Sequence, residues 1–252
     1  FIPKPSARIS PELFDIRDDL HEKVKAIVKT DMKKVLRRSN QDDAETTRKR
    51  IRAGIRKGRK GSEVELVAIG ASTGGPPALQ KIISAIQDEI PVGFAISQHM
   101  PPGFTRAFAD RLNKFSALEV KEAEDGDEVR PGRVLVAPGG KNLAFKQHGG
   151  NVVVKITEPG AGQRYVPSVD HMFKSAAEIY GASVLGVVLT GMGNDGAEGT
   201  RRVKLHGGKV LAESEESSVV FGMPKEAIAT GDVSRVIDLD KMCDAILREC
   251  GF

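Results

Sequence analysis

Residues 64–75 read VELVAIGASTGG, an apolar run that ends in a glycine-rich turn. Two other apolar runs, residues 92–97 and 184–189, lead into short loops that read QHMPP (98–102) and GMGNDG (191–196). Short apolar runs bounded by turn residues are typical of buried parallel strands. Each loop supplies one reactive side chain just past the carboxyl end of its strand, and these side chains are Ser72, His99 and Asp195.

Strand and helix patterns alternate along the chain from residue 64 onward. The patterns predict strands at 64–69, 92–98, 183–189 and 209–212, and helices near 77–89, 103–114, 168–180, 196–206 and 239–249. Two hairpins are predicted in the middle, one pairing 128–129 with 134–137 and one pairing 143–145 with 152–156. We therefore expect an α/β fold, a doubly wound, mainly parallel sheet with helices on both faces and an antiparallel hairpin insertion.

The first 30 residues predict an appendage to this domain, which we expect at 62–252. Ser10 and Pro11 suit the N-cap and the first position of a helix, and apolar residues then recur at helical spacing over 11–30. Nothing nearby in the chain supplies a surface for such a helix. We therefore expect residues 1–30 to be the end of the last strand and the final helix of an upstream domain, with docking on the main domain as the alternative.

Residues 33–60 carry twelve Lys or Arg and three acidic residues, in a chain with a net charge of +4. A basic segment of this kind is most often a solvated linker, and we expect a linker at 31–61. An electrostatic contact with an acidic partner or a nucleic acid is the alternative. Because no aromatic residue lies between these charges, stacking on bases is unsupported and no nucleic-acid partner is expected.

Cysteine usage and hydropathy predict a cytoplasmic protein that does not span the membrane. No apolar run reaches the roughly 18 residues of a membrane span, and no signal peptide is visible. Cys243 and Cys250 lie two turns apart on a predicted helix, too far for a disulfide within it. Without Cys-x-x-Cys or a cluster of cysteine with histidine, we expect ordinary thiols in a reducing compartment, no metal and no other cofactor.

The reactive residues of the three loops are compatible with a hydrolase triad. Residues 70–74 match the Gly-x-Ser-x-Gly pattern of a nucleophile elbow, in which the following helix could aim free N–H groups at an oxyanion. The pattern alone is weak, because a phosphate-binding turn fits it equally well. A serine nucleophile needs a base and an acid that orients the base. Among the five histidines only His99 follows a strand, which favours the triad Ser72–His99–Asp195.

The loop 191–196 also matches Gly-x-Gly-x-x-Gly, the fingerprint of a dinucleotide-binding Rossmann-type protein. Glu213 would then be the acidic residue that holds a ribose. Such a fingerprint normally opens its domain, whereas this one lies near the end and would leave Ser72 and His99 without a task. The dinucleotide site is therefore the alternative to the triad. Capping of the following helix is a further interpretation of Asp195.

Five blocks of sequence carry a resemblance to one family. They are GASTGGP (70–76), QHMPPGFT (98–105), PSVD (167–170), GMGNDGA (191–197) and VFGMP (220–224). From about residue 64 to 240 the chain resembles the catalytic domain of chemotaxis-type protein-glutamate methylesterases, the CheB-type response regulators. In this family a receiver domain phosphorylated by a histidine kinase precedes the esterase, and FIPKP (1–5) resembles the end of a receiver's last strand. ESEE (213–216) departs from the family's usual Gln-Asp opening.

The resemblance implies a substrate and a role for each site residue. It implies hydrolysis of glutamyl methyl esters on the cytoplasmic helical domains of methyl-accepting chemoreceptors, with release of methanol, and deamidation of glutamines in some members. Ser72 becomes the nucleophile, His99 the general base and acid, and Asp195 the orienting acid. The backbone N–H groups of His99 and Met192 become oxyanion donors, and Thr73 an auxiliary residue.

Overall fold

A computed structural model describes residues 64–87 and 90–252. Seven strands form one sheet in the spatial order β3-β4-β2-β1-β7-β8-β9, and every neighbouring pair is parallel. The predicted parallel sheet is therefore confirmed. Its strands are β1 (Leu66–Ala71), β2 (Gly93–Gln98), β3 (Glu119–Glu122), β4 (Arg133–Val136), β7 (Val184–Val188), β8 (Lys209–Glu213) and β9 (Arg235–Ile237).

Six α-helices cover this sheet in the described part of the chain. They are α4 (Gly75–Ala85), α5 (Thr105–Phe115), α6 (Val169–Tyr180), α7 (Ala197–Leu205), α8 (Met223–Ala229) and α9 (Leu239–Glu249), with a short 3-10 turn η1 (Gly181–Ser183) after α6. The five predicted helices are confirmed to within a few residues. The sequence patterns missed α8, because a helix of seven residues is too short for a periodic signal.

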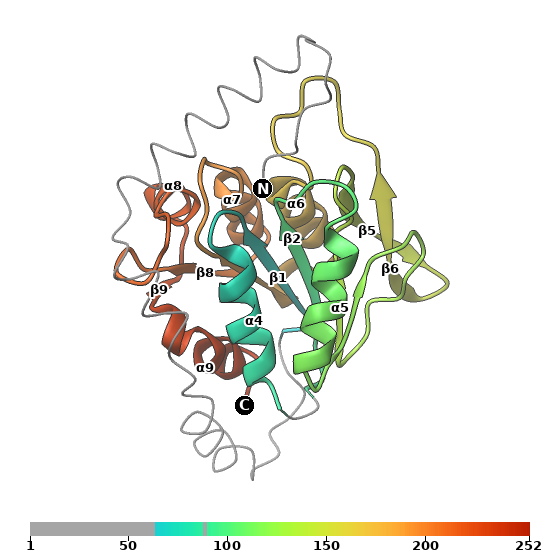
Figure 1. The fold of residues 1–252 in the computed structure, drawn as a ribbon, viewed down its shortest axis with the longest axis horizontal. Helices are drawn as coiled ribbons and strands as arrows, with labels where there is room; N and C mark the ends of the chain where they lie inside the picture. The colour runs from blue at the N-terminus through green and yellow to red at the C-terminus, as the bar shows by residue number, and fades with distance from the viewer. Residues whose placement is uncertain (1–63, 88–89) are drawn as a thin grey trace.

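The alternation of side chains along β1 builds a core on each face of the sheet. Val67 and Ile69 pack in the cluster that contains the apolar residues of α4, α5 and α9. Leu66 and Ala68 pack in the other cluster, with α6, α7 and α8. Figure 1 shows α4 and α5 in front of β1 and β2, with α6 behind them. Helices therefore cover both faces of the sheet, which confirms the doubly wound arrangement. Because β1 is covered on both faces, it is apolar throughout.

One of the two predicted hairpins exists. Strands β5 (Asn142–His148) and β6 (Asn151–Thr157) form a separate antiparallel sheet of two strands. The other hairpin is wrong: residues 134–136 belong to β4, which pairs in parallel with β2 and β3, and Val129 donates instead to the carbonyl of Val152. The Pro-Gly turn at 131–132 is a local signal, and burial of β4 on both faces outweighs it.

The predicted upstream remnant (1–30) and basic linker (31–61) lie outside the described residues. Within the described residues, no helix combines the length and apolar character needed to cross a bilayer. Cys243 and Cys250 are free thiols, as expected. Both are buried, and burial raises the pKa of each thiol to about 12.

Candidate active site

The winding of the sheet reverses at β1, because the chain passes from β1 to β2 on one side and from β7 to β8 on the other. Ligand sites in such sheets lie outside the carboxyl ends of the strands at this reversal. The turns after β1, β2 and β7 carry Ser72, His99 and Asp195. The register pairs Ala71 of β1 with Gln98 of β2, so Ser72 and His99 follow on neighbouring strands at the same level.

Ser72 opens a tight turn between β1 and α4. Its N–H donates to the carbonyl of Thr190 (3.0 Å), and its carbonyl accepts from the N–H of Gly75 (2.8 Å). Gly74 has a φ of +82°, a left-handed conformation that glycine adopts readily. Among the described residues the Ser72 hydroxyl makes no hydrogen bond, so Oγ is available at the end of β1.

The first turn of α4 has no free donors for an oxyanion. Pro76 and Pro77 carry no N–H, and the N–H of Gly75 already donates to Ser72. The N–H of Ala78 is directed to the carbonyl of the N-cap residue. The expectation that this helix aims free N–H groups at an oxyanion is therefore wrong.

His99 and Asp195 form a direct contact. Nε2 of His99 lies 2.7 Å from Oδ2 of Asp195, with side-chain exposures of 14% and 1%. Nδ1 of His99 has no hydrogen-bond partner in the described part of the chain, so it is the ring nitrogen available as a base. The chymotrypsin-type triad uses the two nitrogens the other way round. No hydrogen bond joins Ser72 to the imidazole among the described residues, and such bonds often tighten only with substrate.

Asp195 is held as a carboxylate by the first turn of α6. Its Oδ1 accepts from the Ser168 hydroxyl (3.0 Å) and the Asp170 N–H (2.9 Å), and its Oδ2 accepts from the Val169 N–H (2.7 Å) as well as from His99. Burial favours the protonated acid, but the hydrogen bond and charge of His99 together with these N–H groups hold the pKa of Asp195 below its usual value. A negative charge at a helix N-terminus is also favourable.

Asp170 makes the reciprocal contact with α7. Its Oδ1 accepts from the N–H groups of Gly196 (2.9 Å) and Gly199 (2.6 Å), at the start of that helix. Burial and the neighbouring charge of Asp195 raise the pKa of Asp170 to about 6, against the opposing effect of the two N–H donors. Helices α6 and α7 are thus tied together beside Asp195.

The loop 191–196 packs directly against Ser72. A Cβ built on Gly191 would lie 2.8 Å from Cβ of Ser72 and 2.3 Å from Sδ of Met223, so a side chain has no room there. The next residue, Met192, has a backbone N–H without a hydrogen-bond partner among the described residues. This N–H adjoins the residue that touches Ser72, which is compatible with its expected role as an oxyanion donor.

The fold engages the backbone of two other residues that were expected to assist, His99 and Thr73. The N–H of His99 donates to the carbonyl of Ala71 at 3.0 Å and so extends the ladder between β1 and β2. In this arrangement the expectation that it serves as an oxyanion donor is wrong. The carbonyl of Thr73 accepts from the Thr190 hydroxyl at 2.9 Å, which fixes the turn, and no described contact links the Thr73 hydroxyl to the triad residues.

Two residues beside Ser72, His99 and Asp195 were not identified as candidate site residues from the sequence. Nε2 of Gln98 donates to the carbonyls of both Ser72 and His99, each at 3.0 Å, and joins the ends of β1 and β2. The ring of Tyr165 stacks on His99 with centroids 5.1 Å apart. The only sequence feature that could have pointed to Gln98 is its place in the block 98–105, which resembles the family. Tyr165 lies just before the block 167–170 and has no such feature.

The dinucleotide alternative is not supported. Asp170 already occupies the N-terminus of α7 with its carboxylate, where the pyrophosphate would bind. Glu213 is fully buried, and its carboxylate accepts from the Thr190 N–H and the Ser217 hydroxyl instead of facing a ligand. Two glycines of the fingerprint, Gly191 and Gly193, instead leave room for Ser72 and Tyr165.

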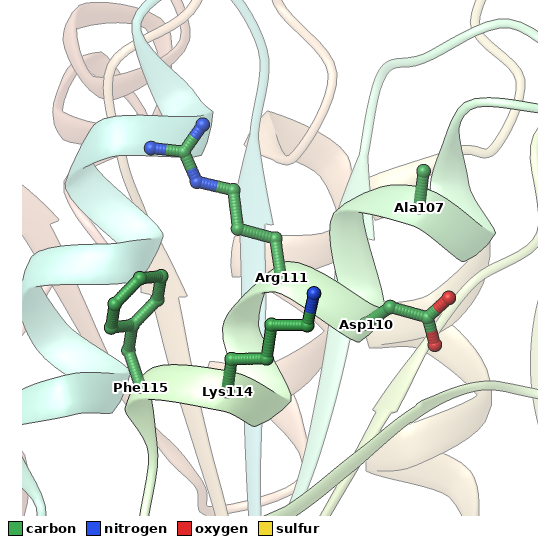
Figure 2. A pocket seen from close by; sticks show the side chains of 5 residues that line it. All are labelled: Ala107, Asp110, Arg111, Lys114 and Phe115. Atoms are coloured by element: carbon green, nitrogen blue, oxygen red, sulfur yellow. The ribbon is translucent and has the colours of Figure 1, made fainter.

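A groove of about 510 Å³ lies on α5, and its lining contains none of Ser72, His99 and Asp195. Figure 2 shows Arg111 and Phe115 directed toward α4, and Nε of Arg111 donates to Oε1 of Gln80 at 3.1 Å. No group of three or more His, Cys, Asp or Glu suited to a metal ion occurs within 64–87 and 90–252.

Comparisons with known proteins identify the family of this chain. The family model described as CheB methylesterase matches residues 67–246. The chain is 48% identical to protein-glutamate methylesterase/protein-glutamine glutaminase 3 of Geobacter sulfurreducens, over 100% of this chain and 71% of that protein. It is 52% identical to protein-glutamate methylesterase/protein-glutamine glutaminase 1 of Myxococcus xanthus, over 72% of this chain and 52% of that protein.

A solved structure extends the agreement to three dimensions. The CheB methylesterase catalytic domain of Thermotoga maritima is 43% identical and superposes with a TM-score of 0.71, over 75% of this chain and 99% of that domain. Because the family model covers most of the chain and the first relative aligns with all of it, the chain belongs to the CheB methylesterase family, a family of carboxylic ester hydrolases.

Proposed function

We propose that this protein is a serine hydrolase that removes methyl esters from glutamate side chains of chemoreceptors and also deamidates glutamines. Ser72, His99 and Asp195 form its catalytic triad. The observation that carries the proposal is the 2.7 Å contact between His99 and an ionised, buried Asp195, next to a half-buried serine just past the end of the neighbouring strand. The names of the relatives, which pair methylesterase with glutaminase, support both reactions.

In the acylation step, Ser72 Oγ attacks the ester carbonyl carbon while Nδ1 of His99 takes its proton. The imidazolium that forms is stabilised by Asp195, which keeps its hydrogen bond to Nε2–H. The carbonyl oxygen becomes an oxyanion, and the N–H of Met192, which has no partner within 64–87 and 90–252, is the donor beside it. When the tetrahedral intermediate collapses, the C–O bond to the methoxy group breaks, and Nδ1–H protonates the leaving group to give methanol.

In the deacylation step, water replaces methanol and the sequence reverses. Nδ1 of His99 takes a proton from the water as it attacks the glutamyl ester of Ser72. Collapse breaks the bond between carbon and Oγ, and the proton on Nδ1 passes to Oγ of Ser72. The glutamic acid that is released then loses its remaining carboxyl proton to solvent and becomes the carboxylate. A glutamine side chain follows the same route, with ammonia as the leaving group.

The partners follow from the same proposal. The substrate would lie on the cytoplasmic helical domains of methyl-accepting chemoreceptors, and the enzyme would work in the cytoplasm. A receiver domain upstream of the linker, phosphorylated by a histidine kinase, would regulate it.

A serine replacement tests the proposal directly. Ser72→Ala should abolish methanol release from a methylated receptor fragment, and an organophosphonate should label Ser72 in the unmodified protein, as seen by mass spectrometry of its peptides. Retained methanol release would refute the triad.

Ser97→Ala is a matched control, because it removes another serine hydroxyl from the same part of the sheet. Ser97 is fully buried, and its hydroxyl has no hydrogen-bond partner among the described residues. Its replacement should leave both methanol release and labelling unchanged, so that a loss in Ser72→Ala reports chemistry and not folding.

A further inference from the structure

The aromatic ring of Tyr165 lies flat against the imidazole of His99. The two ring planes differ by 8°, and their centroids are 5.1 Å apart. Tyr165 comes from the segment before α6, whereas His99 follows β2, so this contact joins two separate parts of the fold.

The Tyr165 ring is itself held from several sides. Its hydroxyl donates to Oδ1 of Asn194 at 3.2 Å, and a Cβ on Gly193 would lie 2.3 Å from that hydroxyl, so this loop closes tightly over it. The guanidinium carbon of Arg164 lies 5.2 Å from the centroid of the same ring, a cation–π distance. The ring is therefore a fixed plane against which an imidazole can be oriented.

The contact with Asp195 alone does not fix the plane of the imidazole. One hydrogen bond from Nε2 selects which nitrogen faces the carboxylate, but the ring can still swing about the line between Nε2 and Oδ2. A parallel stack restrains that swing, because tilting the imidazole would break the contact along the whole ring face. The two contacts together define where Nδ1 points.

We propose that Tyr165 is a positioning residue for His99, whose ring keeps Nδ1 aligned with Ser72 while Asp195 holds Nε2. This inference rests on the proposed esterase function. The stack also favours the imidazolium of the acylation step, because the face of an aromatic ring attracts a cation. Since that charge exists only after Nδ1 takes the proton, the benefit falls on the transition state and not on substrate binding.

Three variants test the role of the ring. Tyr165→Phe keeps the stack and loses the bond to Asn194, whereas Tyr165→Leu loses both. Tyr180→Leu is the matched control, because Tyr180 is the other tyrosine of the chain and makes an edge contact with Phe145 at 6.0 Å, outside the site. Each variant is assayed for kcat and KM of ester hydrolysis and for its melting temperature.

We expect Tyr165→Leu to lower kcat about tenfold with KM within about twofold. Tyr165→Phe should recover most of kcat, and Tyr180→Leu should lower the melting temperature without changing kcat. A normal kcat in Tyr165→Leu would overturn the proposal. A raised KM with normal kcat would also overturn it and make Tyr165 a substrate contact, and equal losses in the Phe and Leu variants would assign the effect to the hydroxyl.

A spectroscopic measurement tests the stack without relying on activity. The carbon-bound ring protons of His99, assigned among the five histidines with a His99→Gln variant, should be shifted upfield by the ring current of Tyr165. They should move downfield in Tyr165→Leu and stay in Tyr165→Phe. Unchanged shifts in the Leu variant would refute the stack, whereas an inactive unmodified protein with normal shifts would refute the esterase function alone.

Discussion

Asp170 and Asp195 cap each other's helices. The carboxylate of Asp170 accepts from N–H groups at the N-terminus of α7, and the carboxylate of Asp195 accepts from N–H groups at the N-terminus of α6. Each acid lies in the first turn of one helix, or just before it, and satisfies backbone donors of the other. Because N–H groups of a first turn have no partner within their own helix, this exchange satisfies donors of both helices. It also fixes the acid that orients His99.

The first prediction concerns Asp195→Asn. The neutral amide cannot stabilise an imidazolium, so kcat should fall about 10³- to 10⁴-fold. Stability should fall as well, because four donors converge on the carboxylate. Ser168→Ala is the control: it removes one of these donors and the N-cap bond to the His171 N–H, should cost about 2 kcal/mol of unfolding free energy, and should keep most of kcat. An Asp195→Asn enzyme with near-normal kcat would contradict the assignment of the acid.

A second prediction concerns Gly191→Ala. The added Cβ would meet Cβ of Ser72, which is close to the backbone and cannot move aside easily. The loop that carries Met192 should shift away from Ser72, and kcat should fall about a hundredfold, as expected for a displacement of about 1 Å. Gly160→Ala serves as the comparison, since nothing lies within 4 Å of a Cβ there. Similar kinetics for both variants would argue against a close approach at Gly191.

A third prediction concerns Gln98→Met. Methionine fills a similar volume but cannot donate to the carbonyls of Ser72 and His99. Loss of the amide that joins these two residues should lower kcat about tenfold, with little change in KM, and should lower the free energy of unfolding by about 1–2 kcal/mol. The exposed Gln147, replaced in the same way, should change neither quantity. A destabilised Gln98→Met protein with full kcat would mean that Gln98 is only structural.

The sequence predicted those parts of the fold that rest on strong local patterns. The apolar runs of β1, β2 and β7 and the long amphipathic helices were identified to within a few residues. The charged edge strand β3 (EVKE) carries no such pattern, and the turn at 131–132 mimicked a hairpin while β4 paired with distant strands. The errors therefore arose where strand pairing depends on distant segments, which local sequence patterns do not reveal.

The candidate site also contains residues that local sequence patterns identify and residues that they do not. The placement of Ser72, His99 and Asp195 at one edge of the sheet could be predicted, because each follows a recognisable strand and parallel strands end at the same edge. Tyr165 could not, since its ring reaches His99 only through the packing of the segment before α6. The N–H of His99 was assigned to the oxyanion from a resemblance, but the ladder between β1 and β2 uses it.

The fourth prediction concerns the dependence of stability on pH. The pKa of Asp170 is about 6 in the folded protein and near 3.8 without its surroundings. The folded state therefore binds more protons between about pH 4 and about pH 6, so the contribution of Asp170 to stability falls as the pH rises through this window. Asp195, with a lowered pKa, has the opposite sign: its contribution is present above about pH 4 and is lost on further acidification.

Asp170→Asn separates the two effects. Both N–H groups bond to Oδ1 of Asp170, so the amide oxygen of asparagine can accept from them while the repulsion with Asp195 disappears. Urea unfolding at a series of pH values should show the variant more stable than the unmodified protein by on the order of 2 kcal/mol at pH 7, with the difference shrinking toward pH 4. A constant difference across this range would mean that Asp170 does not titrate in it, and a less stable variant would mean that its charge on α7 outweighs its repulsion with Asp195.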